Sequence, residues 1–98
     1  MYQLEISEEA KLDIYDAFLW YEEQREGLGL NFELSLEAGF NRVQRNPLQF
    51  ESKHKQVRVH FINKFPFGIH YLVDDQTIKV LAVFHTSRDP KNWFERIQ

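Results

Sequence analysis

The stretch VRVHFINKFPFGIHYLVDDQTIKVLAVFH, residues 57–85, decides the fold, because its apolar side chains alternate instead of recurring at helical spacing. It contains three alternating runs, at residues 57–62, 68–73 and 77–85, which NKFPF and DDQ separate. Alternating runs joined by short turns are typical of an antiparallel meander. We therefore predict three consecutive strands that pair into a sheet.

Alternation also assigns the side chains of these strands to two faces of the sheet. One face is expected to pack against the rest of the chain, and it carries Val57, Val59, Phe61, Ile69, Tyr71, Val73, Ile78, Val80, Ala82 and Phe84. The other face is expected to be open, and it carries Arg58, His60, His70, Lys79 and His85, with Leu72, Leu81 and Val83 among them. A one-residue bulge near Pro66 would reverse the faces of the middle strand.

The residues before this stretch favour helices. A short strand over residues 2–6 is followed by a helix that begins after Ser7, a residue type that caps helix N-termini. The pattern breaks at Gly27 and Gly29, and a second helix begins near Leu30 and ends at residues 46–47, Asn-Pro. Two amphipathic helices joined by a short turn predict an antiparallel hairpin.

The helical hairpin is the only predicted element able to cover the apolar face of the sheet. The fold class is therefore α+β: an N-terminal strand, then an antiparallel helical hairpin packed on one face of an antiparallel sheet, in the order β-α-α-β-β-β. The apolar stripe of the first helix is unusually wide, so this helix is expected to touch more than one neighbour. The side chains that widen it are Leu12, Tyr15, Leu19 and Trp20.

A second helical signal follows the last strand, in HTSRDPKNWFER, residues 85–96. Asp89 and Pro90 form a favourable N-cap and first helical position, so a short C-terminal helix is predicted there. Trp93 and Phe94 would dock that helix on the sheet or in a groove.

Three charged or imidazole side chains near this helix are not explained by its cap. Arg96 is expected to pair with Asp89 or Glu95, or to face solvent. His85 and Arg88 stand at the end of the last strand and are the pair to test for a working site.

Size and composition fit a single domain over residues 1–98, because cores divide only at roughly 250 residues. The chain has no cysteine and a net charge of −3, so neither disulfides nor a thiolate metal site is available. The four histidines are scattered, and no metal or other cofactor is expected. No apolar run is long enough to span a membrane and no signal peptide is evident, so a cytoplasmic location without membrane contact is expected.

The predicted open face carries cations and imidazoles, which suit a phosphate-bearing partner. A histidine there has a pKa near working pH and can move protons. Such side chains are also ordinary occupants of a solvated sheet face, and for each of them that role is the more frequent one. His70, in the middle of a strand, is expected to be structural.

Three segments together resemble the RelE/ParE superfamily, the toxins of bacterial type II toxin–antitoxin modules, often called plasmid stabilisation proteins. They are GLGLNFELSLEAGFNRVQRNPLQF, VRVHFINKFPFGIHYLV and IKVLAVFHTSRDPKNWFER. The resemblance extends from AKLDIYDAFLWYEEQ to the end of the chain, and it implies the same strand–helix–helix–meander fold.

The resemblance implies one of two activities. RelE-like members cleave mRNA in the ribosomal A-site, whereas ParE-like members bind and poison DNA gyrase. The ending HTSRDP is more similar to the ParE type, and no tyrosine follows Tyr71 as in the RelE type. A ParE-like gyrase inhibitor that is not an enzyme is therefore the leading interpretation. A degenerate toxin that retains only antitoxin binding is a further alternative.

The RelE-like alternative assigns roles by resemblance to four positions and to a basic loop. Arg58 and Arg88 would hold the scissile phosphate, and His60 or His85 would move protons. The RNA backbone would be held by the loop residues Lys53 and Lys55.

Under every alternative, the resemblance implies a cognate antitoxin and a toxin–antitoxin hetero-oligomer. The target would be DNA gyrase or the ribosome with its mRNA. The antitoxin is expected to lay a segment across the sheet or the helical groove. The side chains expected to contact a partner are Leu72, Leu81, Trp93 and Phe94.

Overall fold

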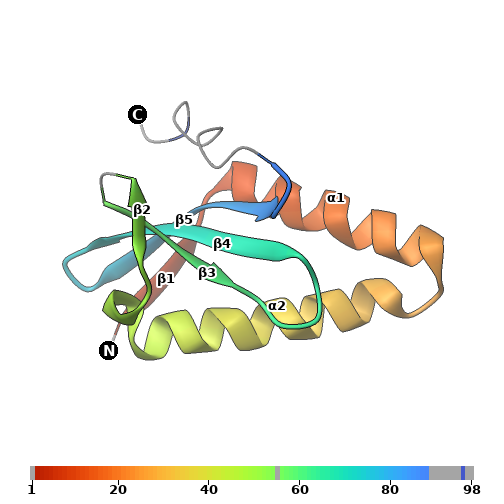
Figure 1. The fold of residues 1–98 in the computed structure, drawn as a ribbon, viewed down its shortest axis with the longest axis horizontal. Coiled ribbons are helices and arrows are strands. Elements are labelled where there is room, and N and C mark those ends of the chain that lie inside the picture. Colours follow the sequence, from red (N-terminus) through yellow and green to blue (C-terminus); the bar gives the residue numbers. More distant parts are fainter. Residues whose placement is uncertain (1, 55, 89–95, 97–98) are drawn as a thin grey trace.

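A computed structural model of the chain describes residues 2–54, 56–88 and 96, and it has the predicted α+β architecture (Figure 1). The elements are β1 (Gln3–Ile6), α1 (Glu8–Gln24), α2 (Leu28–Arg45), the short 3-10 helix η1 (Pro47–Gln49), β2 (Ser52–His54), β3 (Val57–Phe61), β4 (Phe67–Asp74) and β5 (Thr77–His85). The predicted C-terminal helix, with Trp93 and Phe94, lies outside the described residues, as does Lys55. Within those residues, neither helix is long and apolar enough to cross a membrane.

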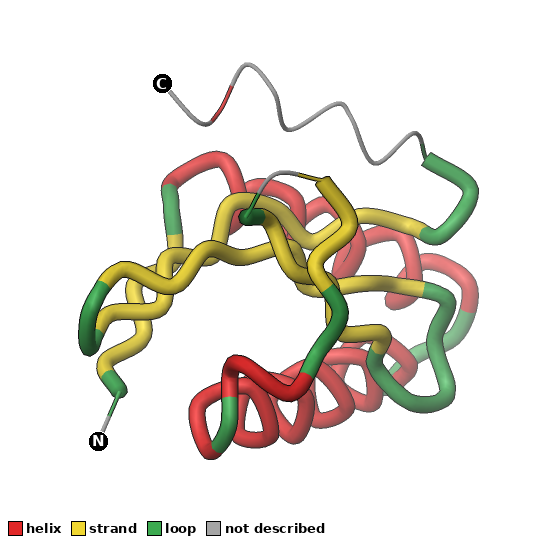
Figure 2. Tube along the Cα trace, turned by 60° about the vertical axis from the view of Figure 1, so that its left-hand side comes forward, coloured by secondary structure: helices red, strands yellow, loops and turns green. Residues whose placement is uncertain are grey.

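The strands form one twisted layer in the order β1-β5-β4-β3-β2 (Figure 2). The predicted meander is confirmed, because β3, β4 and β5 pair antiparallel in succession. The prediction of a wholly antiparallel sheet is wrong, since β1 pairs parallel with β5 and Leu4 lies opposite Ile78. Alternation reveals that a segment is a strand but carries no information on its direction. The short edge strand β2 was expected to be a loop.

Local side-chain chemistry sets the ends of the two helices. Ser7 caps α1 as predicted, because its Oγ accepts a hydrogen bond from the backbone N–H of Ala10 at 3.1 Å. The turn between the helices is held by Glu22, whose carboxylate accepts from the N–H groups of Gly27 and Gly29, both at 2.9 Å. The N-cap of α2 is Gly27 at φ +89°, a conformation that glycine adopts without steric cost.

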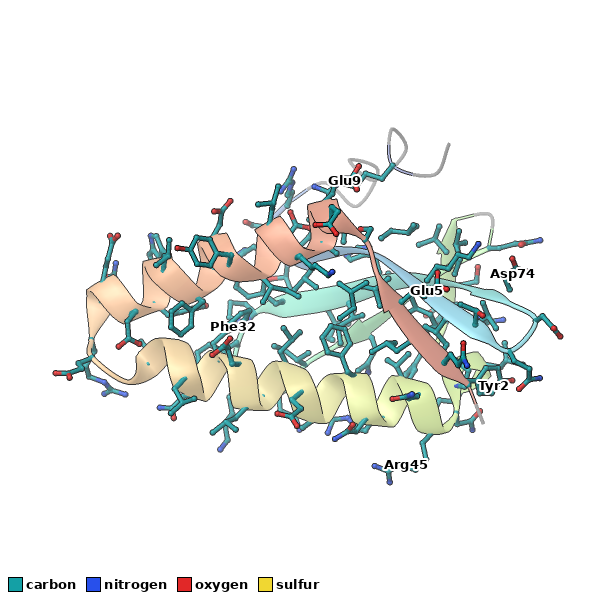
Figure 3. All side chains as sticks on the ribbon, turned by 180° about the vertical axis from the view of Figure 1, so that it is seen from behind. Tyr2, Glu5, Glu9, Phe32, Arg45 and Asp74 are labelled. Atoms are coloured by element: carbon teal, nitrogen blue, oxygen red, sulfur yellow. The ribbon has the colours of Figure 1, made fainter. Side chains whose placement is uncertain are left out.

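Both helices cover the same face of the sheet (Figure 3). Phe32 of α2 is fully buried between the helices and packs its ring against Tyr21, Phe65 and Phe67, with centroids 5.1 to 5.5 Å apart. At Gly39 the helix backbone approaches the sheet so closely that a Cβ would lie 2.8 Å from Ile62 Cγ2. Tight packing of this kind fixes the position of α2 over β3 and β4.

One extra residue in β5 changes which side chains face the helices. Tyr71 lies opposite Val80 and His70 lies opposite Ala82, so Leu81 is unpaired in a β-bulge. Before the bulge Val80 packs in the core under the helices, and after it Ala82 packs in a second cluster on the opposite face.

The predicted faces of β5 are therefore wrong beyond Val80. Ala82 and Phe84 lie on the open face, and Val83 lies in the core under the helices. His85 was predicted on the open face, but it lies opposite Phe67 and beside α1, on the helical side. The middle strand β4 keeps its predicted faces, because the pairing of β3 with β4 shows no register shift.

The predicted faces of β3 are reversed. Residues directly opposite each other on paired strands share a face. Arg58 lies opposite Tyr71 and His60 lies opposite Ile69, so both predicted open-face side chains point toward the helical layer. The side chains of β3 on the open face are Val57, Val59 and Phe61. Alternation divides a strand into two faces, and only its register against β4 decides which face meets the helices.

An ion pair holds the end of the described chain against α1. Arg96 binds Asp13 through two hydrogen bonds, Nη1 to Oδ2 at 2.7 Å and Nη2 to Oδ1 at 3.1 Å. The side chains are only 16% and 10% exposed. The hydrogen bond to Asp13 raises the pKa of Arg96 above its usual value. This pairing corrects the expectation that Arg96 binds Asp89 or Glu95 or faces solvent.

The same two side chains satisfy backbone groups of β5 where β1 no longer runs beside it. Asp13 Oδ2 accepts from the N–H of Val83 at 3.0 Å. The carbonyl of Leu81 accepts from Arg96 Nη1 at 3.0 Å and from Ser7 Oγ at 3.3 Å. Asp13 is thus tied both to the chain end and to the bulge.

We expect the substitution Asp13→Asn to lower the free energy of unfolding by about 3 kcal/mol, because it leaves the buried Arg96 guanidinium without its counter-ion. Urea unfolding followed by circular dichroism measures the change. The control is Lys11→Gln, which breaks the exposed Lys11–Glu8 pair and should change stability by less than about 0.5 kcal/mol. Equal effects of the two substitutions would contradict a stabilising role for the buried pair.

Candidate functional site

Arg58 is occupied in a structural contact. Its Nη1 donates to the backbone carbonyl of Phe50 at 2.6 Å and to that of Leu48 at 3.4 Å. These carbonyls belong to the segment that leads from η1 into β2, so the guanidinium holds that segment against β3. Arg58 Nη1 therefore donates to the backbone and is not available to bind a phosphate.

His60 is likewise engaged on the helical side of the sheet. Its Nε2 accepts a hydrogen bond from Arg42 Nε of α2 at 3.1 Å, and its ring stacks on Phe50 with centroids 4.1 Å apart. Burial, and then the nearby Arg42 guanidinium, lower the pKa of His60. A neutral imidazole that accepts from an arginine is poorly suited to accept a proton from a substrate.

His85 and Arg88 occupy a different place, at the end of β5. His85 Nδ1 accepts from the backbone N–H of Ser87 at 3.0 Å, which places the proton of the neutral ring on Nε2. The Arg88 guanidinium carbon lies 4.1 Å from the centroid of the Phe84 ring. The four predicted catalytic side chains therefore divide into two separate groups on the fold.

The pocket beside this pair, which we call the β5-end pocket, has a volume of about 250 Å³. Its lining residues are Val59, Phe61, His70, Phe84, His85, Thr86 and Arg88. Leu72 and Leu81 lie elsewhere on the same open face, as predicted, packed with Val57, Ala82 and Phe84. Lys53 lies in β2.

His70 is a residue of this pocket to which sequence reasoning gave only a structural role. It is 5% exposed, its ring centroid lies 5.2 Å from that of Phe84, and its Nδ1 has no hydrogen-bond partner. Burial lowers its pKa to about 4, while Asp13 acts in the opposite direction. The imidazole is therefore neutral at pH 7.

A second hollow lies on the other side of His85, against α1. Its lining is mostly aromatic, and consists of Ala17, Trp20, Tyr21, Pro66, Phe67 and His85. Trp20 is 57% exposed there, and Leu12 and Tyr15 are also exposed on α1. Leu30 and Leu34 are exposed on α2. Both helices of the hairpin thus expose large apolar side chains.

A metal site is not evident in the described parts of the chain, because they hold no group of three or more His, Cys, Asp or Glu side chains suited to a metal ion. The chemistry available at the β5-end pocket is hydrogen bonding and cationic attraction over an apolar floor.

Comparison with known proteins agrees with this architecture. Residues 4–90 match the family model described as "ParE toxin of type II toxin-antitoxin system, parDE". The chain belongs to the ParE toxin family. This confirms the resemblance to the RelE/ParE superfamily and assigns the chain to the ParE branch.

Among solved structures, a chain of the "Chromosomal ParDE TA system from P. aeruginosa" is similar to this ParE-family toxin. The TM-score is 0.78, the sequence identity is 18%, and the alignment covers 87% of this chain and 96% of that chain. At this identity the likeness shows the shared fold alone. A search of the curated proteins gave no match.

The low pKa of His70 predicts that stability falls in acid. Above pH 6.5 the ring is neutral in the folded and unfolded chains, and it adds nothing to the pH dependence. Between pH 6.5 and about 4 only the unfolded chain binds the proton, so the free energy of unfolding drops by about 3 kcal/mol. Urea unfolding at intervals from pH 7.5 to pH 4.5 measures this slope.

The variant His70→Leu should show a shallower fall over that range, whereas His85→Gln, at an exposed position, should keep the original slope. Comparison of the two variants separates His70 from the carboxylates and from His60, whose pKa is lowered in the same direction. Parallel curves for His70→Leu and the unchanged protein would refute the assignment.

Proposed function

We propose that this ParE-family toxin inhibits DNA gyrase by binding to it, that it cleaves no RNA, and that an antitoxin neutralises it. The observation that carries the proposal is the separation of the candidate catalytic groups. Arg58 and His60 point toward the helical layer, and His85 and Arg88 lie at the end of β5.

RNA cleavage requires a group that moves a proton and cations that stabilise the phosphate, all within reach of one bond. Arg58 donates to two backbone carbonyls, and His60 accepts from Arg42. His85 and Arg88 remain, with the buried imidazole of His70, in a pocket that has an apolar floor. This arrangement supports a binding role over the RelE-like alternative, and it gives the degenerate alternative no specific support.

The exposed face of the helical hairpin supports gyrase binding. Leu12, Tyr15 and Trp20 of α1 are more than half exposed, and so are Leu30 and Leu34 of α2. Such side chains are typical anchors for a protein partner, because their burial on binding releases water from apolar surface. We assign this surface to the target.

The open face of the sheet is assigned to the antitoxin. Leu72 and Leu81 lie on it beside the β5-end pocket, away from the hairpin. A segment laid across this face would give a toxin–antitoxin hetero-oligomer in which the antitoxin covers Leu72 and Leu81. The contacts predicted for Trp93 and Phe94 remain predictions.

The test is to induce the chain alone in bacterial cells and to follow thymidine and methionine incorporation side by side. We expect DNA synthesis to fall first. The variant Trp20→Ser, at an exposed position, should raise the concentration needed to inhibit gyrase supercoiling in vitro roughly tenfold, as loss of an anchor residue does. Arg88→Gln, at the end of β5 and outside the hollow that Trp20 lines, is the matched control and should inhibit as the unchanged chain does.

The RelE-like alternative predicts the opposite order of inhibition. Methionine incorporation would fall first, cleaved mRNA would accumulate, and Arg88→Gln or His85→Gln would abolish toxicity while Trp20→Ser would not. That pattern would overturn the gyrase proposal.

A further inference from the structure

The β5-end pocket is lined by four polar side chains, His70, His85, Thr86 and Arg88, over an apolar floor. Val59, Phe61 and Phe84 form most of the floor. Arg88 lies over the Phe84 ring. Ser87 binds His85 through Nδ1, so the Nε2–H group of His85 takes no part in that hydrogen bond. Among the residues that the structure describes, those that line the pocket include no acid. The pocket is thus built to favour an occupant that combines apolar surface with negative charge.

His70 is a buried member of the pocket lining. Only 5% of His70 is exposed, and its Nδ1 has no hydrogen-bond partner. A buried polar atom without a hydrogen bond costs roughly 1–3 kcal/mol of stability.

The size of the pocket restricts the occupant. Sites for small molecules usually enclose roughly 300–1,000 Å³. The volume here is about 250 Å³, which suits a single side chain of a polypeptide rather than a nucleotide with its sugar and phosphate. A side chain seated in a pocket of this kind commonly dominates the affinity of a protein interface.

We propose that the β5-end pocket receives one apolar side chain of the antitoxin, and that a carboxylate on a neighbouring antitoxin residue binds Arg88 and His85 at the rim. This inference rests on the proposed function only in naming the antitoxin as the partner. It identifies the recognition element as an apolar residue next to Asp or Glu. The apolar side chain contacts Phe84, and the carboxylate gains both a guanidinium and an imidazole N–H.

The probes are two capped dipeptides, acetyl-Leu-Glu-amide and acetyl-Leu-Gln-amide, together with uridine 5′-monophosphate. Each is titrated into the isotope-labelled 98-residue chain and followed by the imidazole and backbone NMR signals of the pocket. We expect saturable shifts at His70, His85 and Phe84 with the Leu-Glu peptide. The Leu-Gln peptide should bind about fivefold more weakly, as loss of an exposed ion pair implies.

Three variants locate the charge recognition. Arg88→Gln should bind both peptides equally, Arg88→Lys should keep part of the preference for Glu, and Arg45→Gln should keep all of it. Arg45 lies at the end of α2, on another part of the fold, and both arginines are exposed, so the substitutions leave the core intact (Figure 3).

Two outcomes would overturn the proposal: the absence of saturable binding by either peptide, and tighter binding of uridine 5′-monophosphate than of the Leu-Glu peptide. The second would make the pocket a nucleotide site. Because the titration uses the isolated chain and no gyrase, its result is independent of the incorporation experiment. The two proposals can therefore fail separately.

Discussion

The bulge at Leu81 is the constraint on which the rest of the structure depends. β1 pairs with β5 only as far as Val80, and the chain then turns into α1 at Ser7. The backbone groups of β5 beyond that point find partners in Ser7, Asp13 and Arg96. The extra residue thus reverses the faces of β5 beyond Val80. The backbone groups beside it bind Ser7 and Asp13, at the start of the first helix, and Arg96, at the end of the described chain.

The sequence determined the types of the elements far better than their relation to one another. The start of α1 and the end of α2 are set by local chemistry at Ser7 and at residues 46–47, which is visible in a few letters. The direction of β1, the faces of β3 and the bulge depend on pairing between distant segments. The residues around Leu81 are apolar on both faces of the strand. The sequence therefore shows no break in alternation that would reveal the extra residue.

The sequence predicted some residues of the candidate site and missed others. His85 and Arg88 were singled out because the helix cap left them unexplained, and they line one pocket. Arg58 was joined to them by the family resemblance and by an error in the face of β3. Asp13 was missed, although it lies three residues after Ala10 and four before Ala17, both buried, and so on the core side of α1. Its partner Arg96 is 83 residues away, beyond any local pattern.

The parallel pairing of β1 with β5 also has a kinetic consequence. The ribosome makes Gln3–Ile6 before the two helices, but their neighbours in the sheet, residues 77–80, are made only after the helices and the strands β2 to β4. Contacts between such distant segments slow folding, because the entropy of a long loop is lost before the contact forms. During synthesis the first strand therefore has no partner when the residues of the helical hairpin have already been made. The sheet that carries the pocket can be completed only when β5 has been made.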